Sequence, residues 1–199
     1  MKFNRKINPN NKTEHNFITK KRLKEDEIDF NKLRSYRLDR VKKELEKNNL
    51  EACILFDPVN IRYALDTVNM SVHNMHNLTR YCFVPIKGPV ILYEYFNCEK
   101  LSEHLNLIDE IRPAISWDYF GNGSQVDAKL KEWINEISDL SNSYFKSKKI
   151  AIDVLNGPAV LALDKIGIKV VDAKSILEKA RVIKSPEELK CMKAALEVA

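Results

Sequence analysis

The chain has 199 residues, of which 44% are hydrophobic and 31% charged, and its formal net charge is +5. This length suffices for one well-cored domain, or for one domain plus part of another. No apolar run approaches the roughly 20 residues that a membrane-spanning helix requires, and the N-terminus lacks the apolar region of a signal peptide, so we expect a cytoplasmic protein with no membrane partner.

The first 32 residues are polar, rich in Asn and Lys, and without sustained hydrophobic periodicity. Such composition predicts a flexible arm over residues 1–32. Residues 1–30 hold eight Lys/Arg and five Asp/Glu, an excess of three, which leaves an excess of two for the remainder. Because most of the excess charge lies in the arm and not on the folded part, we expect no nucleic-acid partner.

A helix, a strand, a loop and a hairpin are predicted next. Leu38, Val41 and Leu45 recur at helical spacing, which predicts an amphipathic helix over about residues 34–48. The apolar run "EACILFD" predicts a buried strand. The polar stretch that follows it, Asn60 to Tyr81, is predicted as a loop. The runs "YCFVPI" and "PVILYEY" flank a short Lys-Gly turn and predict a β-hairpin.

The second half continues the alternation of helices and strands. "NCEKLSEHLN" predicts a short helix, and "DEIRPAISW" predicts an extended segment. From Val126 to Tyr144 apolar residues step by three and four, which predicts the most regular helix of the chain. "KKIAIDV" predicts a strand, "GPAVLALDKIG" a helix closed by Gly167, and "IKVVDA" a last strand. This order predicts an α/β fold with a mixed β-sheet flanked by helices.

The four cysteines are scattered singly, without a C-x-x-C pair, and three lie in or beside apolar runs. A free thiol in such a place behaves as a small buried hydrophobe. We therefore expect reduced packing thiols, and neither a disulfide framework nor a zinc site.

The last segment, "RVIKSPEELKCMKAALEVA", carries several helix-start signals. Ser185 and Glu188 form a capping box around Pro186, which suits the first helical position. After them comes an apolar stripe of Leu189, Met192, Leu196 and Ala199. The sequence stops inside this helix, so residues 181–199 are expected to be a linker and the start of a truncated further domain.

The same segment resembles the junction of the creatinase, prolidase and aminopeptidase P family, the pita-bread metallohydrolases. In that family a K-[ST]-P-x-E-[IL]-x-x-M-[RK]-x-A pattern opens the catalytic domain. "ACILFDPVNIRYALD" is similar to the family's pattern of a strand followed by N-[IV]-x-Y. The resemblance covers residue 33 to the end. It implies a ribonuclease-H-like creatinase N-terminal domain over residues 33–180, followed by the first helix of a missing pita-bread domain.

The resemblance also implies the chemistry and the partners. The family binds divalent metal (Mn, Zn, Fe or Co) through two Asp, one His and two Glu of the C-terminal domain. This chain alone is therefore expected to hold no cofactor, no metal and no catalytic residue. The implied partners are its own C-terminal catalytic domain, a second subunit of a homodimer, and a small-molecule or peptide substrate.

One departure from the family's common pattern points to a particular branch of the family. Most members have a glycine where this sequence has Asp66, as in Y-L-T-G. The version "IRYALDTVNMSVHNMHN" instead resembles the branch that includes dimethylsulfoniopropionate lyases. The full-length protein is then expected to be an Xaa-Pro peptidase-like hydrolase or an enzyme like those lyases. The alternative is a stand-alone α/β module for binding or dimerisation.

Candidate site residues concentrate in the predicted loop. His73 and His76 are three residues apart, a spacing at which two imidazoles share a helix face and bind a metal, but no Cys, Asp or Glu completes a tetrahedral set nearby. The two other readings are histidines hydrogen-bonded in a polar loop, and, from the resemblance, groups that face the catalytic cleft and select the substrate.

Two further motifs can likewise be interpreted either as ligand-binding groups or as ordinary structural contacts. Arg62 and Arg80 suit either a carboxylate clamp or ordinary salt bridges. The aromatic residues of "SWDYFGNG" suit either a wall for a methylated cation or ordinary core. The substrate-cleft candidates are Arg62, Tyr63, Asp66, His73, His76, Asn77, Arg80, Trp117 and Tyr119.

Overall fold

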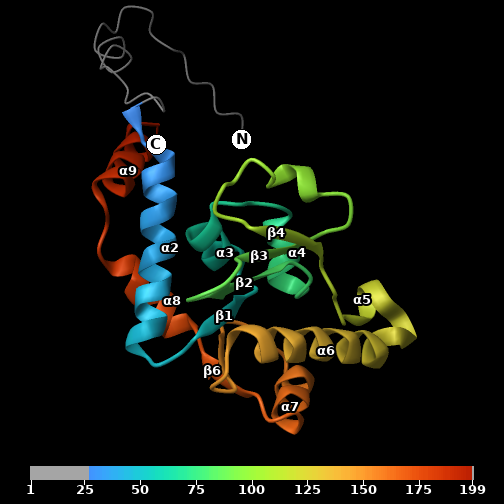
Figure 1. Cartoon of the computed structure of the whole chain (residues 1–199). Coiled ribbons are helices and arrows are strands. Elements are labelled where there is room, and N and C mark those ends of the chain that lie inside the picture. The colour runs from blue at the N-terminus through green and yellow to red at the C-terminus, as the bar shows by residue number, and fades with distance from the viewer. Residues whose placement is uncertain (1–26, 199) are drawn as a thin grey trace, which may run out of the picture.

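The computed structural model describes residues 27–198 and centres on a six-stranded sheet of order β4-β3-β2-β1-β5-β6 (Figure 1). β2 is antiparallel to both of its neighbours, and the other neighbouring pairs are parallel. Every strand except β2 therefore ends at the same edge, and the mixed sheet agrees with the prediction. The strands are β1 Ala52–Leu55, β2 Tyr81–Pro85, β3 Ile91–Glu94, β4 Glu110–Pro113, β5 Lys149–Ile152 and β6 Lys169–Asp172.

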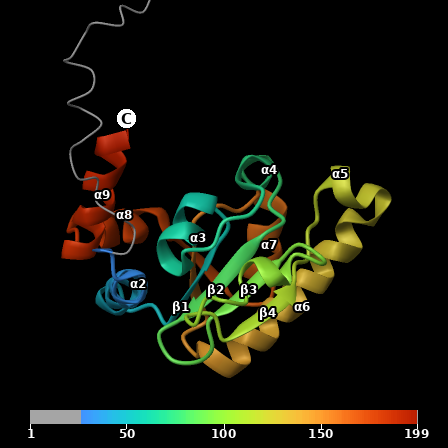
Figure 2. The ribbon, with the colours of Figure 1, turned by 90° about the horizontal axis from the view of Figure 1, so that it is seen from above.

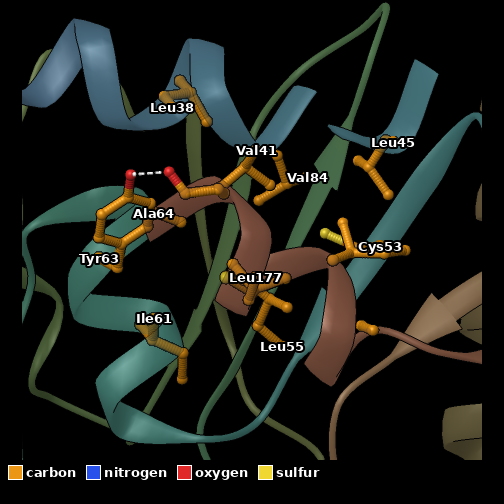
Figure 3. Packing of buried hydrophobic residues seen from close by; sticks show 14 of the residues in the cluster. Leu38, Val41, Leu45, Cys53, Leu55, Ile61, Tyr63, Ala64, Val84 and Leu177 are labelled. Atoms are coloured by element: carbon orange, nitrogen blue, oxygen red, sulfur yellow. Dashed lines mark hydrogen bonds between the residues drawn. The ribbon is translucent and has the colours of Figure 1, made fainter. Parts of the chain in front are cut away.

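Three helices cover one face of the sheet: α2 Phe30–Lys47, α3 Pro58–Leu65 and α8 Lys174–Val182. Figure 3 shows Val41 and Leu45 of α2 packed toward Cys53 of β1, with Leu177 of α8 beside them. The helical spacing of these apolar residues in α2 is what directs its buried stripe onto the sheet. This layer is one of two hydrophobic cores.

The second core lies on the opposite face, under α6 Val126–Tyr144 and α7 Gly157–Lys165. Its largest fully buried side chain is Trp133. The Trp133 ring lies 4.5 Å from that of Trp117 and 6.2 Å from that of Phe56. Because successive strand residues point to opposite faces, Ile54 and Phe56 belong to this core while Cys53 and Leu55 belong to the first.

Several elements differ from the predicted ones. Helix α2 begins at Phe30, not near residue 34, because Asp29 caps it by accepting a hydrogen bond from the Lys32 amide at 2.9 Å. The short helix expected at residues 97–106 is only the 3-10 turn η2 Glu99–Leu101. Helix α8 is absent from the predictions. Residues 1–26 of the predicted arm lie outside the described residues.

The predicted loop between β1 and β2 is largely helical. It contains α3 and a second helix, α4 Ser71–His76. α3 forms because Asp57 caps it through the amides of Val59 and Asn60, and Pro58 occupies its first turn. The prediction of a loop here is wrong: Asp57 and Pro58 are start signals for α3, and α4 contains only two apolar residues, too few to predict a helix from periodicity.

The last helix, α9 Pro186–Val198, begins with the predicted capping box. The Glu188 carboxylate accepts a hydrogen bond from the Ser185 amide at 2.9 Å, and the Ser185 hydroxyl accepts one from the Glu188 amide at 3.2 Å. Glu188 also pairs with Arg37 of α2 at 2.9 Å. The polar side of α9 is thus attached to α2, while its apolar residues Leu189, Met192 and Leu196 are exposed. Ala199, the last residue of the predicted stripe, is not described.

The structure also shows the state of the cysteine thiols. All four cysteines are free; Cys53 and Cys82 lie inside the first core, where burial raises the pKa of both thiols, and the other two are half-buried.

Among the helices within residues 27–198, none combines the length and apolar character needed to cross a bilayer.

Tyr63 of α3 joins the first core to α8. Its hydroxyl donates a hydrogen bond to the Ala180 carbonyl at 2.9 Å, drawn as the dashed line in Figure 3. Burial raises the pKa of Tyr63 to about 12. Because the unfolded chain releases this proton near its ordinary value of about 10, the stability that Tyr63 contributes is complete below that pH and is lost between roughly pH 10 and 12.

We therefore expect the substitution Tyr63→Phe to flatten the loss of stability over this pH range. Urea unfolding followed by circular dichroism at pH 9, 10 and 11 measures it. The matched control is Tyr119→Phe, which removes the hydroxyl of an exposed tyrosine. An identical pH dependence in the Tyr63→Phe variant and the unmodified chain would contradict the assignment.

Candidate functional site

A hollow of about 180 Å³ lies at the edge where all strands except β2 end. In open α/β sheets, ligands bind in the crevice outside the carboxyl ends of the strands. α4 and the short helix α5 Tyr119–Asn122 flank this edge (Figure 2). The hollow is lined by His76, Asn77, Leu78, Trp117, Asp118 and Asn156.

The two histidines of α4 have different surroundings. His73 is half-buried, and its ring centre lies 6.1 Å from that of Tyr95 and 6.4 Å from that of Phe120, which connects α4 to α5. The Asn77 amide nitrogen lies 3.4 Å from His73 Nδ1. His76 is exposed and faces the hollow. Within residues 27–198 no three His, Cys, Asp or Glu side chains are grouped so as to hold a metal ion.

Arg80, for which the sequence left open a carboxylate clamp or a salt bridge, forms a salt bridge inside the protein. Its Nε lies 2.8 Å from Glu94 Oε2, and the two side chains are 1% and 0% exposed. Arg80 Nη2 also donates to the Thr67 hydroxyl at 2.6 Å, and Thr67 is hydrogen-bonded to the Ser102 hydroxyl. The second Glu94 oxygen accepts from the Tyr95 amide at 2.9 Å and from Asn69 at 3.1 Å. The pair is a closed network beneath the site.

Asp153, which follows β5, was not among the predicted site residues. Its carboxylate accepts hydrogen bonds from the amides of Phe56 and Asp57 at 2.8 and 3.1 Å, and from the Asn60 side chain at 2.9 Å. Burial raises the pKa of Asp153 although these donors favour the charged form. Asp153 therefore ties the end of β1 to the end of β5. The sequence signal that could have identified Asp153 is its position as an acidic residue directly after the buried strand "IAI".

The aromatic motif divides between core and surface. Trp117 is buried against Trp133 and Phe56, and it presents only its margin to the hollow. Tyr119 and Phe120, two and three residues further on, are exposed on α5. Asp118 holds this arrangement, because its carboxylate caps α5 through the Gly121 amide at 2.7 Å.

The three candidates on α3 lie apart from the lining of the hollow. Tyr63 points into the first core, and Arg62 is exposed and makes no ion pair within residues 27–198. Asp66 ends α3 in the left-handed conformation, with φ of 58°, and its carboxylate accepts from Arg34 Nε at 2.8 Å. This position is the one where the family pattern has glycine, and Asp is among the residues that tolerate left-handed backbone best.

Comparison with known proteins identifies the fold and its relatives. The family model of the creatinase/prolidase N-terminal domain matches residues 37–183. The dimethylsulfoniopropionate lyases DddP of Roseobacter denitrificans and Roseovarius nubinhibens are each 30% identical to the chain, over 168 and 169 residues. These matches cover 84% of this chain and 38% of each lyase, so the chain spans well under half the length of these relatives.

Solved structures show the same fold at lower identity. An Xaa-Pro aminopeptidase from Streptococcus pyogenes superposes with a TM-score of 0.54 at 12% identity, covering 76% of this chain and 100% of that one. An Xaa-Pro dipeptidase from Bacillus anthracis gives 0.53 at 15% identity, covering 78% of this chain and 38% of that one. With the strand order, the helix layers and the family match in agreement, the chain belongs to the creatinase/prolidase N-terminal domain family.

Proposed function

We propose that the chain is the non-catalytic N-terminal domain of a two-domain enzyme, and that its carboxyl edge forms one wall of the substrate cleft. The relatives of 30% identity are lyases, whereas the matching peptidase structures are 12–19% identical, which favours a lyase like DddP over an Xaa-Pro hydrolase. The proposed partners are the catalytic domain, which would carry any divalent metal, and a second subunit of a homodimer.

The observation that carries this proposal is the composition of the hollow. Imidazole, amide and carboxylate groups from His76, Asn77, Asp118 and Asn156 converge there beside the margin of Trp117. The polar groups come from three segments that only the fold brings together. A wall of this kind orients a small polar substrate through hydrogen bonds, and it needs no catalytic group of its own.

The test uses the enzyme expressed from the complete reading frame. We expect His76→Ala to lower kcat/KM for dimethylsulfoniopropionate roughly 3- to 10-fold, the size of one lost hydrogen bond. The matched control is His104→Ala, because His104 is also exposed but does not line the hollow. The assay follows dimethyl sulfide release, with Xaa-Pro dipeptides as the second substrate.

The outcomes separate the hypotheses. Equal activity of the two histidine variants would exclude His76 from the cleft wall. Cleavage of Xaa-Pro dipeptides without lyase activity would replace the lyase by the hydrolase. A reading frame that encodes no catalytic domain would instead support the stand-alone binding or dimerisation module.

A further inference from the structure

Helix α4 is packed the opposite way from an ordinary surface helix. Its apolar residues Val72 and Met75 are 74% and 67% exposed, and its one buried residue is the polar Asn74, at 1%. A helix of six residues is too short to be stable by itself, and burial of apolar side chains normally provides the missing stability. Something other than the hydrophobic effect must therefore hold α4 in place.

The Asn74 side chain supplies that attachment. Its Nδ2 donates to the Phe56 carbonyl at 2.6 Å and to the Arg80 carbonyl at 3.1 Å. Its Oδ1 accepts from the Arg80 amide at 2.7 Å and from the Tyr95 hydroxyl at 3.4 Å. Both donors and both acceptor positions of the amide are used. The partners lie after β1, before β2 and after β3, so one side chain joins α4 to three strands.

The receiving site for Asn74 is itself fixed. Arg80, which provides two of the four bonds through its backbone, is held by the buried pair with Glu94. Glu94 in turn accepts the Tyr95 amide, and Tyr95 is the third partner of Asn74. The buried ion pair and the amide therefore form one continuous network from the sheet to α4.

We propose that Asn74 is a positioning residue that pins α4 to the carboxyl edge and thereby sets the places of His73 and His76 beside the hollow. Asn74 does not face the hollow and acts only through its neighbours in α4. The consequence for substrate binding rests on the proposed function, but the pinning itself does not.

Hydrogen exchange of the unmodified 199-residue chain gives a first test that needs no variant. The opening of α4 must break the bond from the Arg80 amide to Asn74. The Arg80 amide should therefore exchange together with the Asn74 and Asn77 amides, and roughly tenfold or more faster than the β2 amides of Cys82 and Val84. Exchange of the Arg80 amide at the β2 rate while α4 opens would overturn the proposal.

Two substitutions test the individual bonds. Asn74→Ala should raise exchange in α4 by at least about tenfold with β1 and β2 unchanged, and should shift and broaden the imidazole signals of His73 and His76 in nuclear magnetic resonance spectra. Asn106→Ala, at an exposed amide, is the control and should change neither. Equal acceleration throughout the sheet, or unmoved histidine signals, would overturn the positioning role.

Asn74→Asp adds a readout that loss of packing alone cannot produce. The carboxylate keeps the acceptor oxygens but loses both donors, so above its pKa it should release α4 as Asn74→Ala does. When protonated, it regains one donor for the Phe56 carbonyl. The rate of α4 exchange in Asn74→Asp, divided by the rate in Asn74→Ala at the same pH, should therefore fall as the pH is lowered. A ratio that does not change with pH would contradict the role of the donated bonds.

In the complete enzyme, Asn74→Ala is expected to raise KM roughly fivefold or more with kcat within about twofold, because it displaces a binding wall and removes no reacting group. If exchange shows α4 released but KM is unchanged, the positioning role at the site is overturned while the attachment stands. If His76→Ala also leaves kcat/KM unchanged, the proposed function fails, and the exchange results still decide the attachment.

Discussion

Replacing Arg80 with alanine is expected to lower the free energy of unfolding by about 3–5 kcal/mol, the range for breaking a buried ion pair. The cost arises because Glu94, which is fully buried, would keep a charge with no cation beside it. Urea unfolding followed by circular dichroism measures the loss. The control is Arg112→Ala, whose pair with Glu110 is more than a third exposed and should contribute about 1 kcal/mol or less.

The double variant Arg80→Ala with Glu94→Ala makes the test sharper. It should be destabilised by less than the sum of the single variants, because the second substitution removes the charge that the first one isolates. Strict additivity, or equal losses for Arg80→Ala and Arg112→Ala, would show that burial of the pair has little effect on stability.

Replacing Trp133 with alanine is expected to cost about 3–5 kcal/mol, because it empties the centre of the second core between Trp117 and Phe56. Trp133→Phe is the matched control. It keeps an aromatic ring, and it removes an indole N–H that finds no acceptor within residues 27–198. We expect it to cost less than half as much as the alanine variant.

The same urea unfolding reads out both Trp133 variants. Trp117 is then the single remaining tryptophan, so its fluorescence reports the unfolding of this core directly. A loss below about 1 kcal/mol in Trp133→Ala would mean that the core collapses around the gap without a cavity.

Hydrophobic periodicity and capping signals were sufficient for most of the fold. They identify α2, α6 and the β2–β3 hairpin, because burial of apolar side chains holds each of them, and they identify the start of α9 through the local hydrogen bonds of its capping box. Periodicity fails for α4, where Val72 and Met75 face outward and the buried residue is Asn74. The hydrogen-bond partners of Asn74 lie next to the ends of three different strands, and no local pattern contains that information.

The residues of the candidate site were likewise only partly predictable from the sequence. His76, Asn77 and Trp117 line one hollow, together with Asp118 and Asn156, which were not among the predicted residues. Of the two readings of Arg80, the salt bridge is the one that the structure shows, because the hairpin places Arg80 beside Glu94: Tyr81 pairs with Tyr93, so the preceding and following residues come together. Carrying the register of the predicted hairpin one residue further would have revealed this internal pair.

The attachment of α2 to the last helices has a consequence for biosynthesis. Arg40 of α2 donates to the Ala180 carbonyl, and 140 residues separate the two. At roughly 5–20 residues per second, a ribosome needs roughly 7–28 s to cover that distance. Throughout this interval α2 has been synthesised, but α8, which packs against it, has not. We therefore expect nascent chains halted within that window, once α2 has left the ribosome, to expose Val41 and Leu45 without the cover of α8.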